Sequence, residues 1–193
     1  MTTPTAEVRG LSFDEASARA RRLKLVATDC DGVLTDGGVF YSDAGEAMLR
    51  FSRRDGMGFE LLRNAGIASA IVTRENSPIV ARRAEKLGLR LFAGVRDKKT
   101  WLDQYLAEEG ARGTQAAHLA YIGDDVNDLD IMQAIAPHGL IGAPADAVPE
   151  VRALAHFVAP VPGGSGALRA FADFILGLRE APRGHNPLER SGS

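Results

Sequence analysis

Short apolar runs alternate with helical patterns over most of the chain, and this alternation constrains the fold more than any other feature of the sequence. Runs rich in Val, Ile, Leu and Ala are typical of strands buried on both faces of a parallel sheet, with helices between them. The strands are expected at residues 24–28, 67–72, 89–92, 119–122 and 139–141, with a short sixth at 157–159. The helices are expected at residues 12–23, 56–64, 78–86, 100–109, 129–135, 149–155 and 166–178. The pattern predicts an α/β fold, a Rossmann-like parallel sheet with helices on both faces.

Residues 38–52 break this alternation. Two short β-like runs, 39–41 and 48–51, flank the turn-forming segment 42–45, so we expect a β-hairpin that projects from the sheet.

The two ends of the chain differ from its middle. Residues 181–193 hold two Pro and two Gly without an apolar period, which is typical of a disordered tail. In the first helix, acidic residues interleave with Arg19, Arg21 and Arg22, and these arginines are expected on a solvated face of a docking helix. The expected organisation is an N-terminal extension with a helix (1–22), one α/β domain (23–180) and a disordered tail (181–193).

Composition excludes some classes of protein. A chain of 193 residues that is 45% hydrophobic can form one core without a structural metal, and its single cysteine, Cys30, cannot form an intramolecular disulfide. The 23 Lys and Arg against 25 Asp and Glu argue against a nucleic-acid partner. No apolar run approaches the ~18 residues of a membrane-spanning helix and no export signal is visible, so a cytoplasmic protein is expected.

Carboxylates follow two of the predicted strands. Asp29 and Asp31 come after the first strand, and a second group follows the fourth: Asp124, Asp125 and Asp128. Ligands of open α/β sheets bind beyond the carboxyl ends of the strands. Acids brought together there repel one another unless a cation binds, and hard oxygen ligands suit Mg²⁺. A capping or turn role explains Asp128 alone equally well, but it does not explain all five acids.

The same edge of the sheet should carry Thr73 and Lys98, which follow the second and third strands. A calcium loop of the EF-hand type fails on spacing, because Val33, Leu34 and Phe40 occupy positions that such a loop reserves for ligands or Gly. Phosphoryl transfer fits better: one carboxylate attacks, a second protonates the leaving oxygen, and Mg²⁺, Lys and a hydroxyl bind the phosphoryl oxygens.

Four segments resemble, in order, the motifs of the haloacid dehalogenase superfamily of phosphatases. They are residues 29–37 (Asp-Cys-Asp-Gly-Val-Leu-Thr-Asp-Gly), Thr73, Lys98 and residues 123–128 (Gly-Asp-Asp-Val-Asn-Asp), and the resemblance covers about residues 23–178. It implies that Asp29 is the nucleophile and a Mg²⁺ ligand, and that Asp31 is the general acid and base with its backbone carbonyl on the metal. It further implies phosphoryl-oxygen contacts from Thr73 and Lys98, and Mg²⁺ binding by Asp124 with Asp125 and Asp128 in support. An acid at position 31 implies phosphate-ester hydrolysis rather than dehalogenation.

The spacing between the motifs leaves no room for a cap domain, because the intervening residues are taken up by the hairpin and by single helices and strands. A capless enzyme acts on a large substrate or has its site closed by another subunit. Three segments resemble the 3-deoxy-D-manno-octulosonate 8-phosphate (KDO 8-phosphate) phosphatase family: the expected hairpin, the segment 52–58 and the segment 163–169. This family also includes nonulosonate (sialic-acid-type) 9-phosphate phosphatases and some acylneuraminate cytidylyltransferase C-terminal domains. The resemblance implies a homotetramer in which hairpins form a barrel and a neighbouring subunit completes each site. Its implied substrate is the phosphate ester of a 3-deoxy-2-keto sugar acid.

The candidate substrate residues match this family unevenly. Arg74 and Glu75 follow Thr73, where octulosonate phosphatases typically have Gly-Arg, and Glu75 with Lys86 is closer to the nonulosonate pattern. Arg83 could bind a carboxylate through its forked guanidinium, or could lie on a solvated helix face. The remaining candidates stand at the start of the helix predicted at 56–64, where capping of that helix is the favoured role for Asp55 over a contact with substrate: Arg54, Asp55 and Gly56.

Two other classes of function stay open at this point. A signalling receiver domain also has an acidic Mg²⁺ pocket with Thr and Lys, but its acid pair precedes the phospho-acceptor, whereas here a second acid cluster follows Lys98. A non-catalytic tetramerisation module is the other alternative. Retention of the full set of motif residues argues against it, although it does not prove turnover.

Overall fold

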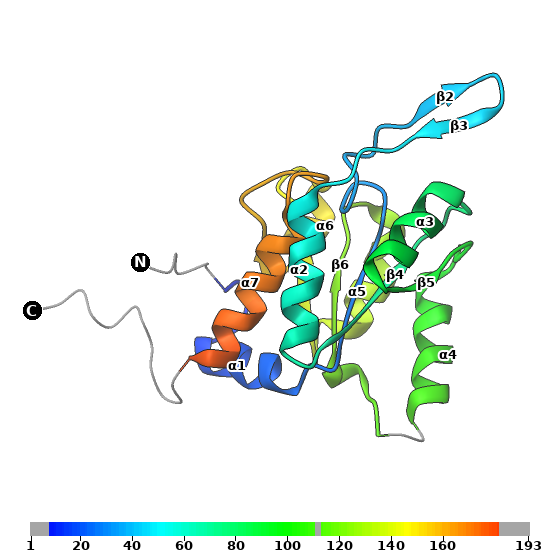
Figure 1. Ribbon diagram of the computed structural model, residues 1–193. Coiled ribbons are helices and arrows are strands. Elements are labelled where there is room, and N and C mark those ends of the chain that lie inside the picture. The colour runs from blue at the N-terminus through cyan, green and yellow to red at the C-terminus, as the bar shows by residue number, and fades with distance from the viewer. Residues whose placement is uncertain (1–7, 111–112, 182–193) are drawn as a thin grey trace, which may run out of the picture.

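Six parallel strands form a single sheet with helices on both faces (Figure 1), as the alternation of strands and helices predicted. The structure, a computed structural model, describes residues 8–110 and 113–181. In spatial order the strands are β5 (Arg90–Phe92), β4 (Ala68–Val72), β1 (Leu25–Thr28), β6 (Leu119–Ile122), β7 (Leu140–Ala143) and β8 (Phe157–Val158). Every neighbouring pair in this sheet is parallel. The predicted α/β fold class and all six predicted strands are therefore confirmed.

The helices divide into two layers, each with its own core. One layer consists of α1 (Phe13–Arg22), α2 (Arg53–Asn64), α3 (Pro78–Leu87) and α7 (Ala167–Glu180). The other consists of α4 (Lys98–Gly110), α5 (Leu129–Ile135) and α6 (Pro149–Leu154). Side chains of β1 alternate between the cores, with Val26 in the first and Leu25 and Ala27 in the second, because successive strand residues point to opposite faces.

The order of the strands places the site. From β1 the chain moves outward to β4 and β5, and then returns through α4 to β6 on the other side of β1. The direction of winding thus reverses between β1 and β6, and a crevice at such a point is where open α/β sheets bind ligands. The two segments richest in carboxylates begin directly after these two strands.

A separate two-stranded hairpin, β2 (Phe40–Ser42) and β3 (Gly45–Met48), projects from the carboxyl edge of the sheet (Figure 1). The predicted hairpin is confirmed, but its second strand was placed wrongly at 48–51. Ser42 pairs directly with Gly45, so the turn is shorter than expected and the strand starts earlier. At the base of the hairpin, Arg50 Nε lies 2.8 Å from Asp36 Oδ2.

Helix α1 packs on the domain instead of presenting all its arginines to solvent. Ala16 and Ala20 are fully buried in the first core, and Arg19 is only 7% exposed. The Arg19 guanidinium donates hydrogen bonds to the carbonyl oxygens of Ala136 and Gly139 at 2.6 and 2.9 Å. The expected solvated face is wrong for Arg19, because these carbonyls satisfy its donors inside the protein.

The division into residues 1–22, 23–180 and 181–193 stays a prediction, and all of the predicted tail except Ala181 lies outside the described residues. No helix in the part of the chain that the structure describes is long and apolar enough to cross a membrane.

His156, between α6 and β8, offers a test of the packing far from the carboxylates. It is 8% exposed, and its Nδ1 accepts a hydrogen bond from the Ile141 amide at 3.1 Å. Burial lowers the pKa of His156 to about 4, so the unfolded chain takes up the proton first as pH falls. The stability from neutral His156 is therefore present above its ordinary pKa of 6.5 and is lost as pH falls toward 4.

We expect His156→Asn to remove this pH dependence, because the Asn Oδ1 can accept from the Ile141 amide but does not titrate. Between pH 7 and pH 4 the free energy of unfolding of the wild type should fall by up to about 3 kcal/mol more than that of the variant. Urea unfolding of both proteins across that range measures the difference. If the free energy of unfolding changes equally with pH in the two proteins, the pH dependence does not come from His156.

Candidate active site

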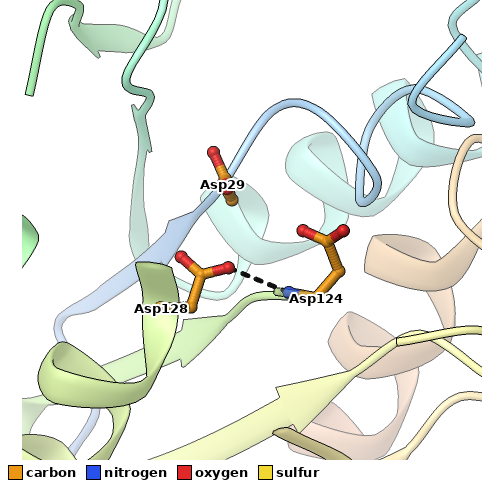
Figure 2. A group of neighbouring side chains, drawn as sticks. All are labelled: Asp29, Asp124 and Asp128. Atoms are coloured by element: carbon orange, nitrogen blue, oxygen red, sulfur yellow. Dashed lines mark hydrogen bonds between the residues drawn. The ribbon is translucent and has the colours of Figure 1, made fainter. Parts of the chain in front are cut away.

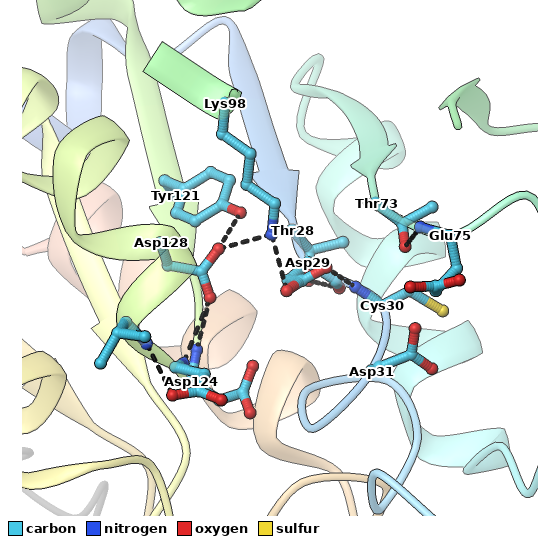
Figure 3. A network of polar contacts seen from close by, with 12 residues as sticks. Thr28, Asp29, Cys30, Asp31, Thr73, Glu75, Lys98, Tyr121, Asp124 and Asp128 are labelled. Carbon is cyan, nitrogen blue, oxygen red and sulfur yellow. Dashed lines mark hydrogen bonds and ion pairs between the residues drawn. The ribbon is translucent and has the colours of Figure 1, made fainter. Parts of the chain in front are cut away.

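Asp29 stands where β1 ends, and it is held from two sides. The residue is 5% exposed; one carboxylate oxygen lies 2.6 Å from Lys98 Nζ and the other accepts from the Cys30 amide at 2.6 Å (Figure 3). Lys98 is the first residue of α4 and is itself only 2% exposed. The crossover from β5 back to β6 therefore brings a buried cation against the predicted nucleophile.

Asp128 organises the site without being free to bind a ligand. It ends the short helix η2 (Val126–Asp128) and is fully buried. Its Oδ1 accepts from Lys98 Nζ at 2.6 Å and from the Tyr121 hydroxyl at 2.7 Å, while its Oδ2 accepts from the amides of Asp124 and Asp125 at 2.9 and 3.3 Å (Figure 3). A carboxylate has about four acceptor positions. All of them are taken, which fits the predicted supporting role.

Asp124, in contrast, has a free oxygen. Asp29, Asp124 and Asp128 each bring an oxygen to within 4.8 Å of the others (Figure 2), and Asp124 Oδ1 is buried with no hydrogen-bond partner among the described residues. Burial and the charges of Asp29 and Asp128 raise the pKa of Asp124 to about 8. Burial and Asp128 likewise raise the pKa of Asp29 to about 7, although Lys98 opposes the shift.

These observations fit a divalent cation. An unpartnered buried oxygen beside a second carboxylate is a place where a hard cation replaces missing donors and offsets repulsion. Gly32 permits the approach, because a Cβ there would fall 1.9 Å from Asp124 Oδ2. With Asp128 saturated, Asp29 and Asp124 are the side chains of this group that would hold Mg²⁺, together with the predicted backbone carbonyl of Asp31.

Asp31 lies on the other side of Asp29 from Asp128 (Figure 3). The Thr35 hydroxyl donates to its Oδ1 at 3.4 Å. Burial raises the pKa of Asp31, and the charges of Glu46 and Glu75 raise it further, while the Thr35 hydrogen bond opposes them. A carboxyl group that keeps its proton more readily than usual suits a general acid.

Two residues of the site carry no motif and were missed by sequence reasoning. Glu46 reaches from β3 to accept a hydrogen bond from the Ser77 hydroxyl, which also caps α3. Tyr121 is a buried strand residue whose hydroxyl binds Asp128. Neither a glutamate in an exposed hairpin nor a tyrosine in an apolar run signals such a contact, because both depend on how distant segments pack.

The predicted substrate residues do not gather into one group. Thr73 directly follows β4, is 1% exposed, and its hydroxyl accepts from the Glu75 amide at 3.3 Å. Arg74 and Glu75 are exposed on the adjoining loop, and Arg54 is exposed in the first turn of α2. Lys86 lies in the last turn of α3, about 12 Å along the axis from the end nearest the carboxylates.

Arg83 and Asp55 are engaged with the protein itself. Arg83 Nη2 donates to the Ser52 carbonyl at 3.1 Å, and the guanidinium lies 5.6 Å from the Phe51 ring centre. Gly56 adjoins it, since a Cβ there would fall 3.4 Å from Arg83 Nη2. Asp55 is 2% exposed and accepts from the Arg169 amide at 2.9 Å, so it caps α7 and not, as the capping alternative had it, its own helix, whose N-cap is Ser52. Burial raises the pKa of Asp55 to about 6, although that hydrogen bond opposes the shift.

Comparison with known proteins assigns the family. None of the protein-family models matches the sequence. The chain is, however, 40% identical over 159 residues to the 3-deoxy-D-manno-octulosonate 8-phosphate phosphatase KdsC of Haemophilus influenzae, an alignment that covers 82% of this chain and 85% of that protein. The chain belongs to the KDO 8-phosphate phosphatase family of the haloacid dehalogenase superfamily.

Solved structures of this phosphatase family share the fold. The cobalt-bound phosphatase of Haemophilus influenzae superposes with a TM-score of 0.76 at 38% identity, covering 83% of this chain and 91% of that one. The Moraxella catarrhalis phosphatase, in complex with magnesium, phosphate and KDO, superposes with a TM-score of 0.77 at 32% identity and covers 87% and 94%. Family members thus hold divalent cations, in agreement with the Mg²⁺ predicted from the carboxylates.

We expect Mg²⁺ to stabilise this phosphatase more at pH 8.5 than at pH 6.5, because protons occupy Asp29 and Asp124 at the lower pH and must leave before the metal binds. At a metal concentration about 100 times the Kd, binding adds about 2.7 kcal/mol to the free energy of unfolding. For a chain of this size this raises the Tm by roughly 5–10 °C. Thermal unfolding with and without MgCl₂ measures the shift. Asp124→Asn should abolish it, and an undiminished shift in that variant would contradict the assignment of Asp124 as a ligand.

Proposed function

We propose that the chain hydrolyses KDO 8-phosphate, with Mg²⁺ bound, through an aspartyl-phosphate on Asp29. One observation carries this proposal: the buried Asp29 carboxylate lies between the Lys98 ammonium, at 2.6 Å, and the unpartnered oxygen of Asp124, in a chain of this phosphatase family. A non-catalytic module has no need of a buried lysine and two carboxylates whose charges are costly without a cation. The receiver alternative is not favoured, since the relatives are phosphatases.

The proposed reaction divides into two displacements at phosphorus. An oxygen of Asp29 attacks, the bond from phosphorus to the sugar oxygen breaks, and Asp31 gives its proton to that departing oxygen, which leaves as a hydroxyl. Asp31 then takes a proton from water as that water attacks the phosphoryl group, which releases inorganic phosphate and restores both carboxyl groups. Lys98 and Thr73 contact the phosphoryl oxygens in both steps. Bound Mg²⁺ supplies positive charge toward those oxygens.

Substrate choice is tested by assaying phosphate release from KDO 8-phosphate and from a nonulosonate 9-phosphate side by side, with Mg²⁺ present. We expect kcat/KM to favour KDO 8-phosphate by at least about tenfold. A preference for the nonulosonate ester would assign Arg74 and Glu75 to that substrate instead. Inactivity toward both esters would overturn the proposal and favour the non-catalytic module.

The hairpin supports a further part of the proposal, an assembly of several copies. Phe40, Tyr41 and Met48 are 60%, 75% and 60% exposed, an apolar surface that a monomer would leave in water. We infer a homotetramer in which hairpins from neighbouring copies pack together, as the family resemblance implies. Light scattering at assay concentration should give about four times the chain mass, and a monomer there would contradict this. A cytoplasmic location stays a prediction from the sequence.

A further inference from the structure

Helix α7 begins without a capping side chain of its own. Its N-cap residue is Gly166, at φ +107°, so the first amides of the helix need an acceptor from elsewhere. Asp55 supplies it from the first turn of α2: its Oδ1 accepts from the Arg169 amide at 2.9 Å, and the amides of Gly166 and Leu168 also act on this carboxylate. The negative charge faces the positive end of the α7 dipole.

The two helices fix this contact in place. Gly58 of α2 lies so close to α7 that a Cβ there would fall 3.0 Å from the Arg169 Cα. Arg83 holds the start of α2 through the Ser52 carbonyl and adds a positive charge near Asp55. The start of α2 is thus held in place, and Asp55 contacts the start of α7 from this fixed position.

The loop before α7 packs directly on the turn that follows the nucleophile. The Gly164 amide donates to the Val33 carbonyl at 2.9 Å. A Cβ at Gly163 would fall 1.9 Å from the Gly32 carbonyl oxygen and 2.9 Å from that of Thr35. Backbone therefore lies against backbone with no side chain between them, and a shift of the loop must displace residues 32–36.

That turn determines where the predicted general acid lies. Thr35 is fully buried, and its hydroxyl donates to Asp31 at 3.4 Å. Contacts therefore run without a gap from Asp55 to the start of α7, then through residues 163–166 to Thr35 and Asp31.

We propose that Asp55 is a positioning residue of the active site: by capping α7 it holds residues 163–166 against the turn 32–36 and so fixes Asp31. This inference rests on the proposed phosphatase function. It assigns Asp55 no contact with substrate, which separates it from the substrate role expected from the sequence.

Kinetics of Asp55→Ala and Asp55→Asn, assayed well below their melting temperatures, test the proposal. For Asp55→Ala we expect kcat to fall about tenfold to a hundredfold with KM within about twofold, since misplacing a reacting group lowers the rate of the chemical step. Asp55→Asn keeps an acceptor for the Arg169 amide and should recover kcat to within about threefold of wild type. Asp173→Ala is the matched control, because the exposed Asp173 pairs with the half-buried Arg169 side chain at 2.8 Å and its removal leaves the Arg169 amide untouched.

Two kinetic outcomes would overturn the inference. A raised KM with unchanged kcat would make Asp55 a substrate contact, and unchanged values of both in folded Asp55→Ala would make the cap purely structural. If Asp55→Ala does not fold, Asp55→Ser, whose side chain is too short to span to the Arg169 amide, takes its place.

Hydrogen exchange separates failure of this inference from failure of the proposed function. Without any substrate, the alanine variant should lose protection about tenfold or more at residues 163–169 and also at residues 32–37. Unchanged protection at 32–37 would overturn the inference whatever the activity. A wild type that is inactive toward all phosphate esters would instead overturn the proposed function.

Discussion

Asp29→Asn is expected to abolish phosphate release, with kcat about 10⁴-fold or more below wild type, because the amide cannot form the acyl-phosphate bond. Asn keeps the shape of the side chain and an acceptor for the Cys30 amide, which lies 2.6 Å from the carboxylate. Burial and Asp128 raise the pKa of Asp29 to about 7, so a neutral side chain should fold at least as well. Loss of activity would then report chemistry and not unfolding.

The measurement is single-turnover and steady-state phosphate release, with thermal unfolding of the same samples. Asp103→Asn provides the control, because it makes the same chemical change at an exposed residue of α4 that pairs with Lys99. Residual activity above about one per cent in Asp29→Asn would assign the nucleophile to another group.

Lys98→Met should damage both activity and stability. Lys98 lies 2.6 Å from both Asp29 and Asp128, and all three side chains are almost completely buried. Without the ammonium two buried carboxylates face each other, which should lower the free energy of unfolding by about 3–5 kcal/mol. Loss of positive charge at the phosphoryl group should lower kcat about 10²-fold to 10³-fold.

The loss of stability in Lys98→Met should depend on pH. Since the pKa of Asp29 is raised, the repulsion in Lys98→Met is relieved by a proton at low pH and is greatest above pH 7. Urea unfolding at pH 6 and pH 8.5 should show the larger deficit at the higher pH. Lys99→Met is the control, because Lys99 is the next residue and its side chain is 42% exposed. If both variants lose the same free energy of unfolding at each pH, the assignment of a buried ion pair to Lys98 is wrong.

The sheet and the centre of the site could be predicted because both depend on local sequence. Runs buried on both faces are apolar throughout, and the residues that follow them must meet at one edge of a parallel sheet. Asp29 and Asp124 are brought together in this way, as are Lys98 and Asp128. Their order along the chain also distinguished this site from a receiver domain.

The features of the fold and of the site that the sequence did not predict depend on packing between distant segments. A buried arginine such as Arg19 looks in sequence like a solvated one, because the carbonyls that satisfy it come from residues more than a hundred positions away. Asp55 could be recognised as a cap, but not as the cap of a helix that starts at residue 167. The resemblance to known families singled out Lys86 and Glu75, yet α3 carries Lys86 away from the carboxylates within one chain.

Two contacts within the chain hold the hairpin. Glu46 binds Ser77 at the start of α3, and Arg50 binds Asp36 at the base, so both ends of the hairpin are attached to the domain that carries the site. A surface whose shape is set in advance loses little conformational entropy when it meets a partner. Association of copies through these hairpins would therefore resemble the docking of rigid bodies rather than coupled folding, and its free energy would come from the apolar area that is covered.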